Sequence, residues 1–386
     1  MVFSLNSLKS YLQSKQGTLL CVGPMSKLCI DVAVEISRQH NIPLGLIASR
    51  RQIDGSQWGG GYVQNFTTEA FCEYVRHKNN PNVFIARDHG GPWQSPYEVN
   101  QQLDEASAMA SAKQSFELDI VSGVDVLHID PSIPIKGETL THEKILDRLL
   151  ELYGHCDEFA KQQGKSIAFE LGTEEQDGYG QDLDKFDYFL HTVRQFCAKH
   201  HLTPPLFVVA QTGTKVMEMQ NIGAFGQFSN ASLPIEQLQK TLAICKKYEV
   251  YLKEHNTDYL SNEALALRPI LGIHASNVAP EFGVAETRGW IYLMQVFGLT
   301  HELTRFVALA VASKKWEKWL LPQSCATDIE RAMICGHYLG AHPEVRLLKE
   351  RVTHALALQG VDVTQWLRQL IKESMMRYVR LFKRRE

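Results

Sequence analysis

Short apolar runs alternate with segments of helical period along the first 300 residues of this chain. Eight of the runs have the length of a buried strand, and helical stretches such as "KLCIDVAVEISRQH" separate them. Continuous apolar runs between helices are typical of parallel strands that are covered on both faces. The predicted strands are residues 19–22, 44–48, 83–86, 124–129, 167–171, 206–210, 250–253 and 270–273.

Eight strand–helix units in a row favour a closed barrel over an open sheet. No GxGxxG or GxxxxGK[ST] sequence follows the first strand, which counts against an open nucleotide-binding sheet. We therefore predict an α/β fold, a (β/α)8 TIM barrel, over residues 18–300. Residues 1–17 are expected to form a helix that caps the barrel, and residues 301–386 a helical extension.

The last segment of the extension, "VTQWLRQLIKESMMRYVRLF", carries apolar side chains at helical spacing. We expect this stripe to bury Trp366, Leu370 and Tyr378. An apolar face of that size is rarely left in water, so a face without a partner inside the chain would form a subunit interface. A homo-oligomer is therefore predicted.

Composition narrows the class of protein. The chain is 44% hydrophobic and 22% charged, which is ordinary for a globular enzyme. A net charge of −3 gives no electrostatic reason to expect nucleic acid or a membrane surface as partner. The sequence shows no membrane-length apolar stretch and no signal peptide. Eight cysteines without a CxxC pair indicate reduced core thiols, and the predicted location is cytoplasmic.

Polar residues recur where the predicted strands end. "ARDHGGP" at 86–92 follows the third strand, and other ionisable residues keep the same rhythm. In a barrel of this kind the chemistry sits at the carboxyl ends of the strands, so a shared site is expected there. The candidate residues are Arg50, Arg51, Asp88, His89, Asp130, Glu170, Gln211, His255, Asp258, His274, Ser276 and Asn277.

Several candidates are metal-binding residue types. His89 and His255 are the predicted ligands of one divalent ion, with Gln211 or His274 completing the set. Nitrogen and oxygen donors suit Zn²⁺, or a harder ion if oxygens dominate. Such an ion could polarise a sugar carbonyl. Asp88 and Glu170 are then the candidates for proton transfer.

The remaining candidates are predicted to hold substrate. Arg50 and Arg51 could bind a phosphate or carboxylate, although "SRR" could equally be a solvated loop. His128 precedes "ID" in an apolar run and is interpreted as a hydrogen-bonded core histidine. The other predicted substrate-binding residues are Asp130, Asp258, Ser276 and Asn277.

Four motifs together carry a family resemblance. "ARDHGGP", "LHIDPS", "ELGTE" and "KEHNTDY", in this order and spacing, resemble the accessory subunits of class II D-tagatose-1,6-bisphosphate aldolases, the KbaZ/GatZ type. The resemblance covers roughly residues 18–300. It implies a barrel related to zinc-dependent class II aldolases, a catalytic role for Asp88 and zinc binding by His89 and His255. Gln211 stands where catalytic class II aldolases have a further zinc histidine.

Two functions remain open at this point. The first is a metal-dependent enzyme of carbohydrate metabolism, an aldolase-like lyase or an epimerase acting on a sugar or sugar phosphate. The second is a non-catalytic subunit that stabilises a catalytic class II aldolase partner, as the resembled subunits have been regarded. His274 and the run "HASNVAPEFGVAETR" differ from what is expected of those subunits, which indicates a divergent branch with its own substrate.

Overall fold

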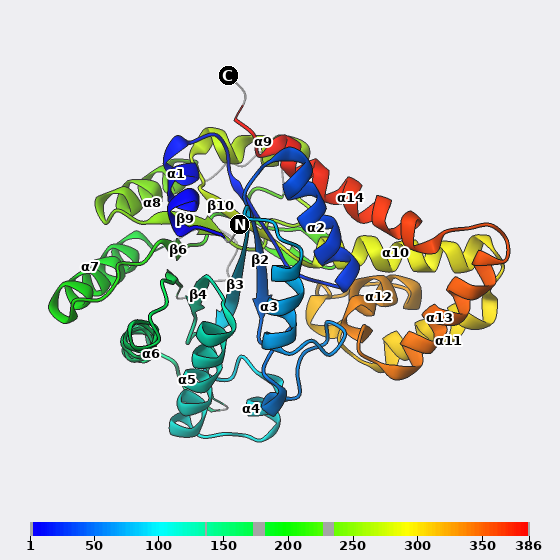
Figure 1. Ribbon diagram of the computed structural model, residues 1–386, viewed down its shortest axis with the longest axis horizontal. Coiled ribbons are helices and arrows are strands. Elements are labelled where there is room, and N and C mark those ends of the chain that lie inside the picture. Colours follow the sequence, from blue (N-terminus) through cyan, green and yellow to red (C-terminus); the bar gives the residue numbers. More distant parts are fainter. Residues whose placement is uncertain (1–2, 136, 173–181, 227–234, 385–386) are drawn as a thin grey trace.

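The computed structural model describes residues 3–135, 137–172, 182–226 and 235–384. Eight parallel strands close into a barrel inside a ring of helices, so the predicted (β/α)8 barrel is confirmed (Figure 1). Neighbouring strands follow chain order, and β1 closes the ring against the last strand. The barrel strands are β1 (Leu19–Val22), β2 (Leu44–Ser49), β3 (Val83–Gly90), β4 (Val126–Ile129), β5 (Ala168–Leu171), β6 (Phe207–Val209), β9 (Tyr251–Glu254) and β10 (Ala275–Val278).

Most strands are followed by a helix that begins at a polar cap. Ser26 is one such residue, and its Oγ accepts the backbone N–H of Cys29 at 3.0 Å. A short antiparallel pair, β7 (Val216–Met217) and β8 (Gln220–Asn221), interrupts the connection after β6. The helices of the barrel are α2 (Lys27–His40), α3 (Thr68–His77), α4 (Pro96–Asn100), α5 (Glu105–Ser122), α6 (His142–Gln162), α7 (Leu183–His200), α8 (Ile235–Lys247), α9 (Asn262–Leu271) and α10 (Pro280–Val296).

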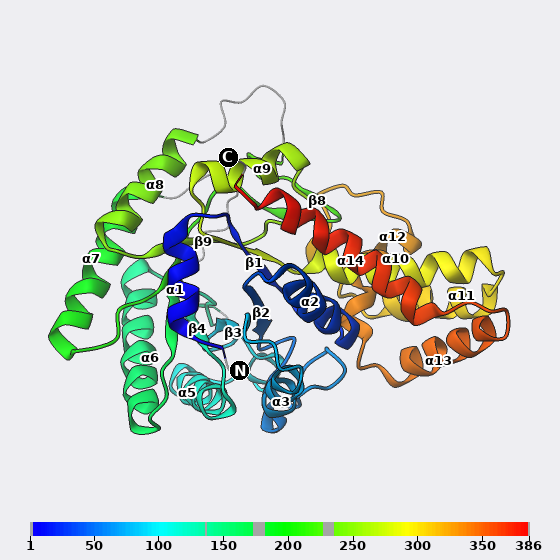
Figure 2. The same ribbon diagram turned by 45° about the horizontal axis from the view of Figure 1, so that its top comes forward.

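The amino end of the barrel is filled with apolar side chains. Helix α1 (Leu5–Ser14) lies across this end and contributes Leu8 and Leu12 to the same core (Figure 2). Because strand side chains alternate, every second residue of a strand points into the barrel. The inward core consists of Leu19, Cys21, Ile47, Phe84, Ala86, Val126, Ala168, Phe207 and Ala275.

The predicted eighth strand was wrong in position. Ile270 and Leu271 end helix α9, and Gly272 stops that helix in the left-handed conformation with φ +89°. The strand is Ala275–Val278, and all four of its residues are buried. Polar Ser276 and Asn277 concealed it, because their side chains resemble those of a loop.

Residues after 300 form helices beside the barrel. Figure 1 shows α11 (Thr300–Ala312), α12 (Asp328–Cys335) and α13 (Pro343–Ala357) gathered at the right, while α14 (Val363–Leu381) runs back to the barrel. There α14 packs against α2, α9 and α10. Two short 3-10 helices, η2 (Glu317–Trp319) and η3 (Gly336–Leu339), join these elements. The division of the chain into a cap (residues 1–17), a barrel (18–300) and an extension (301–386) stays a prediction.

The stripe predicted along α14 was wrong in part. Tyr378 is fully buried, but Trp366 keeps 38% of its surface exposed and stacks on Tyr292, with ring centroids 6.1 Å apart. Leu370 is half-buried. The helix is turned so that a different row faces inward, with residues four apart: Val363, Leu367, Ile371, Met375 and Val379.

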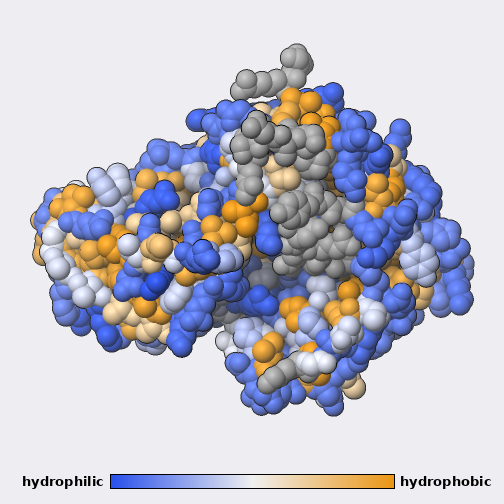
Figure 3. All heavy atoms as spheres, turned by 180° about the vertical axis from the view of Figure 1, so that it is seen from behind, coloured by the Kyte–Doolittle hydropathy of each residue, from blue (hydrophilic) through white to orange (hydrophobic). Residues whose placement is uncertain are grey.

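The opposite face of the molecule is hollowed near its middle, and hydrophilic side chains line the hollow (Figure 3).

Within the described residues, no helix combines the length and apolar character needed to cross a bilayer. All eight cysteines are described and carry free thiols; seven are buried, and Cys325 is exposed.

Candidate active site at the carboxyl end of the barrel

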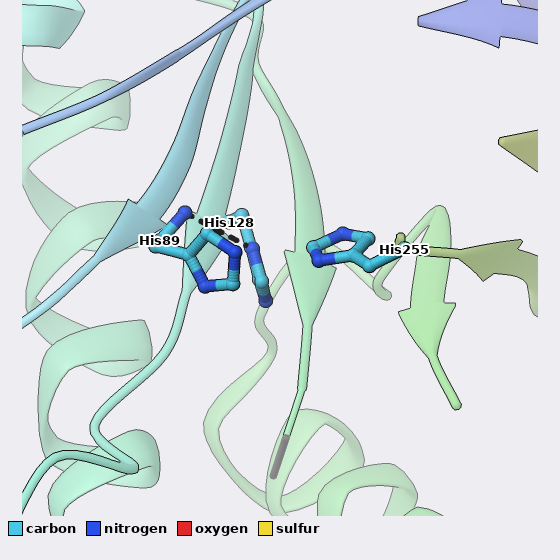
Figure 4. A group of neighbouring side chains, drawn as sticks. All are labelled: His89, His128 and His255. Carbon is cyan, nitrogen blue, oxygen red and sulfur yellow. Dashed lines mark hydrogen bonds between the residues drawn. The ribbon is translucent and has the colours of Figure 1, made fainter. Parts of the chain in front are cut away.

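Three imidazoles meet at the carboxyl end of the barrel. The ring centroids of His89, His128 and His255 lie 5.0 to 5.3 Å apart (Figure 4). Asp88 and Glu170 lie beside them, and Asp88, His128, Glu170 and His255 each bring a donor atom within 4.8 Å of the others. We call these five residues the histidine cluster.

Strand alternation explains why these residues meet. Ala86, Val126 and Ala168 point into the barrel, and two residues further along the same strands come Asp88, His128 and Glu170. The inward rows therefore change from apolar to ionisable as they reach the carboxyl end. The two inward residues of β9 and β10 at this level are Lys253 and Asn277.

A bulge brings two consecutive residues, Asp88 and His89, into one site. Neighbouring residues of a regular strand point to opposite faces of the sheet. The pairing of β3 with β4 shifts register between Arg87 and Gly90, and His89 has φ +45°. A bulge of this kind bends the strand and redirects a side chain. Because of it, the imidazole of His89 faces the same space as the carboxylate of Asp88.

Asp130 holds His89 in place. Its Oδ2 lies 2.7 Å from Nδ1 of His89, and the Gln94 amide donates to the same oxygen at 2.8 Å. The backbone N–H of His89 donates to Nδ1 of His128 at 3.2 Å. These bonds fix the orientation of two of the three imidazoles.

The two carboxylates of the cluster have different surroundings. Glu170 accepts a hydrogen bond from Nζ of Lys253 at 2.6 Å and lies 3.3 Å from Nε2 of His255. Asp88 accepts from the Asn277 amide at 3.1 Å. Its oxygens lie 3.6 to 3.8 Å from the nearest nitrogens of the three imidazoles.

The positive charges around these carboxylates keep them ionised. Burial alone would raise the pKa of Asp88, but His89 and His255 lower it well below its usual range. Burial likewise opposes ionisation of Glu170, yet Lys253, His128 and His255 lower its pKa to about 2. The pKa of His128 is raised in return, because Glu170 and Asp88 outweigh the effect of its burial.

Two residues predicted to bind substrate are committed to contacts within the protein. Arg50 is buried and pairs with Asp54 at 3.0 Å and with Glu98 at 2.5 Å. Ser276 points outward from β10 and donates to Glu254 at 2.8 Å. The structure does not bring either residue to the histidine cluster.

Asp258 also lies outside the cluster and holds the start of α10. It accepts the backbone N–H groups of Ala279 at 3.0 Å and Glu281 at 2.8 Å. Burial and the nearby Glu281 raise the pKa of its carboxyl to about 8. Of the residues predicted to bind substrate, Asp130 and Asn277 are thus the two that contact the cluster, through His89 and Asp88 respectively.

The two residues predicted to complete the metal site, Gln211 and His274, lie in different parts of the barrel. His274 precedes β10 at the amino end of the barrel, where its Nδ1 accepts the N–H of Leu252 at 3.1 Å. The structure therefore does not bring it to the cluster. Gln211 is buried just after β6, and its Oε1 accepts the N–H groups of Gly213 and Thr214.

Sequence reasoning missed two residues, His128 and Lys253. His128 was interpreted as a core histidine because it lies in an apolar run, but it lies two residues after Val126 on the inward row. Lys253 lies on β9 two residues before His255, on the same inward row. Alternation counted from the apolar core was the signal that could have found both residues. Residues 173 and 174 of the "ELGTE" motif lie outside the described residues.

Comparisons with known proteins give structural likenesses at low sequence identity. No protein-family model and no curated protein matches the chain. A probable tagatose 6 phosphate kinase from Sinorhizobium meliloti 1021 superposes with a TM-score of 0.74 at 15% identity, covering 94% of this chain and all of that one.

Two further solved structures share the architecture. The fructuronate-tagaturonate epimerase UxaE from Cohnella laeviribosi has a TM-score of 0.58 at 12% identity, covering 94% of this chain and 82% of its own. A fructose-bisphosphate aldolase from Campylobacter jejuni has a TM-score of 0.53 at 11% identity, with 99% and 95% coverage. These likenesses establish the fold.

Proposed function

We propose that this chain is a metal-dependent enzyme with aldolase-like or epimerase-like chemistry on a sugar or sugar phosphate. The observation that carries the proposal is the convergence of three imidazoles and two carboxylates at the carboxyl end of the barrel. In barrels of this fold that end holds the catalytic residues. The names of the structurally similar proteins, among them an epimerase and an aldolase of sugar substrates, make sugars and their phosphates the first compounds to test.

The donor set fits a divalent ion, with Zn²⁺ as the first candidate. His89, His128 and His255 would hold it, with Glu170 as an oxygen ligand. His128 takes the place that Gln211 or His274 was expected to fill. Asp130 supports His89 in the way that carboxylates commonly orient a metal-binding histidine. Bound there, the ion would supply Lewis-acid polarisation of a substrate oxygen.

Asp88 is the proposed proton carrier. Its side chain keeps 11% of its surface exposed, whereas Glu170 is fully enclosed and bound to Lys253. The low pKa of Asp88 keeps it ionised and able to accept a proton from a substrate C–H or O–H group. Asn277 holds the carboxylate by its amide N–H, and the buried amide oxygen of Asn277 has no hydrogen-bond partner among the described residues. That oxygen is available to a substrate hydroxyl.

Metal analysis and a substrate screen of the purified chain test this proposal. We expect about one divalent ion per chain in the unaltered protein and in Asp88→Asn, and loss of the ion in His89→Ala and His255→Ala. Turnover of a sugar or sugar phosphate should fall by roughly 10²–10⁴-fold in Asp88→Asn, as for loss of a general base. His274→Ala is the matched control, because it removes an imidazole at the other end of the barrel.

Two outcomes would count against the proposal. Full metal content in both His89→Ala and His255→Ala would mean that the cluster is not the metal site. A metal-loaded protein without turnover, combined with stabilisation of a class II aldolase chain on mixing, would favour the non-catalytic subunit instead.

A further inference from the structure

A cavity of about 830 Å³ lies between the loop after β2 and the helical extension. Its volume is within the range of small-molecule sites, roughly 300–1,000 Å³. Among the described residues that line it, none belongs to the histidine cluster. The walls include, from the loop, Arg51, Trp58 and Tyr62 and, from the extension, Lys315, Lys318 and Tyr338.

The cavity is strongly basic. Arg51, Lys314, Lys315 and Lys318 face a single lining carboxylate, that of Glu317, so the formal charge is four minus one, or +3. Within the described part of the chain, none of the four cations forms an ion pair. This contrasts with Arg50, the neighbour of Arg51, which contacts two carboxylates. The chain therefore leaves these positive charges uncompensated in a concave site.

The cations also act on one another. The surrounding protein lowers the pKa of Lys318 to about 8, and the charges of Arg51 and Lys315 add to the effect. Nζ of Lys315 donates to the backbone oxygen of Tyr338 at 3.2 Å, which holds that lysine at the wall. Like charges gathered in this way repel, and a bound anion would relieve the repulsion.

The uncharged part of the wall suits a ring. Tyr62 and Tyr338 meet edge to face, with centroids 4.9 Å apart, across the boundary between barrel and extension. Trp58 is followed by Gly59 and Gly60 in left-handed conformation, with φ +87° and +66°. A Cβ on Gly59 would meet no atom within 4 Å, so the loop borders open space there. Aromatic side chains of this kind commonly pack on flat or weakly polar ligand faces.

We infer that this cavity binds a phosphorylated small molecule, with its phosphate against Arg51, Lys315 and Lys318 and its ring against the aromatic wall of Trp58, Tyr62 and Tyr338. Arginine and lysine together are the residues that recognise phosphate through charge-assisted hydrogen bonds. A ligand held in this way would contact both the barrel and the extension. The site is separate from the chemistry proposed for the histidine cluster. Sugar phosphates and nucleotides share the recognised group.

Calorimetric titration of the full-length protein tests the inference with four probes: inorganic phosphate, fructose 1,6-bisphosphate, ADP and, as a control anion, sulfate. We expect one of the two organic phosphates to bind more tightly than sulfate. The double variant Lys315→Ala/Lys318→Ala should weaken that binding at least about tenfold, because two charge-assisted contacts are lost. The control Arg346→Ala/Arg351→Ala removes two exposed charges of the extension that do not line the cavity and should bind as the unaltered protein does.

The outcomes separate this site from the cluster. Binding of the bisphosphate alone, or of ADP alone, supports the inference and identifies the class of ligand. Unchanged affinity of His255→Ala for that organic phosphate also supports the inference. The metal content of the same variant is measured alongside. The inference is overturned if neither organic phosphate binds more tightly than sulfate, if both double variants weaken binding equally, or if His255→Ala abolishes it.

Discussion

The two faces of the barrel strands carry buried charges of different kinds. On the outer face, Arg87 donates to both oxygens of Asp119, at 2.8 and 2.6 Å, and further to backbone oxygens of the β2 region. One residue along on the inner face, Asp88 lies among three imidazoles without a bidentate partner. Glu254 and Lys253 repeat the contrast on β9: Glu254 is fixed by Arg268 and Ser276, and Lys253 points inward to Glu170.

Charges on the outer face stabilise the fold, whereas charges on the inner face are the candidates for chemistry. Outer charges link a strand to the helix that covers it, and their partners are fixed within the protein. Inner charges gather where four strands, β3, β4, β5 and β9, end, and they share their partners, so they can accept a ligand or a proton. The same alternation that separates core from surface in simpler barrels here separates structural ion pairs from a candidate active site.

The largest effect is expected on the outer face. Arg87→Ala should lower the free energy of unfolding by about 3–5 kcal/mol, because it leaves the carboxylate of Asp119 buried without its ion-pair partner. Urea unfolding followed by circular dichroism measures the change. Asp88→Asn keeps the size of its side chain and should change stability far less.

Arg305→Ala is the control for loss of an arginine. Arg305 pairs with Glu344 on the surface of the extension, where water screens the interaction, and its removal should hardly alter unfolding. If Arg87→Ala were as stable as Arg305→Ala, the proposed division between the two faces would be wrong.

A smaller effect is expected from Asp130, which belongs to the inner face but acts through His89. Asp130→Asn should weaken divalent-metal affinity by roughly 10–100-fold, since the carboxylate that orients the imidazole is lost. A competition titration against a chelating dye gives the affinity. Asp258→Asn, another buried aspartate that follows a barrel strand, should leave it unchanged because Asp258 caps α10. Equal losses in both variants would contradict the positioning role.

Much of the architecture followed from the sequence, because buried parallel strands are continuous apolar runs. Strands one to seven lie within a few residues of their predicted places. The eighth was misplaced, because Ser276 and Asn277 are polar on both faces of a buried strand. Trp366 was misplaced for a related reason, since spacing along a helix defines a stripe but not how the helix is turned against its neighbours.

The candidate site was only partly visible in the sequence. The strand rhythm singled out Asp88, His89, Glu170 and His255, and all four lie in the cluster. It gave no reason to separate them from Arg50. The ion-pair partners of Arg50, Asp54 and Glu98, lie four and 48 positions further along the chain. Nor could it foresee the bulge that brings Asp88 and His89 to the same space, because a register shift depends on the pairing of two strands.

The smallest expected effect is a dependence of metal affinity on pH. Metal ions bind neutral imidazole, so a protonated histidine must release its proton on binding. Burial lowers the pKa of His128, but Glu170 and Asp88 outweigh this and raise it above its usual value, so His128 carries a proton at a higher pH than an isolated histidine. Affinity should therefore fall as pH falls through that pKa, by about tenfold per unit for one proton, and level off above it.

Because the pKa of Glu170 is about 2, its carboxylate stays ionised between about pH 5 and 8. Glu170 therefore adds nothing to the dependence of metal affinity on pH. Glu170→Gln removes the strongest influence that raises the pKa of His128, so the fall in affinity should begin at lower pH. Titrations of both proteins between about pH 5 and 8 compare the two curves. Superimposable curves would show that the inner charges are not coupled in the way the comparison of the two faces requires.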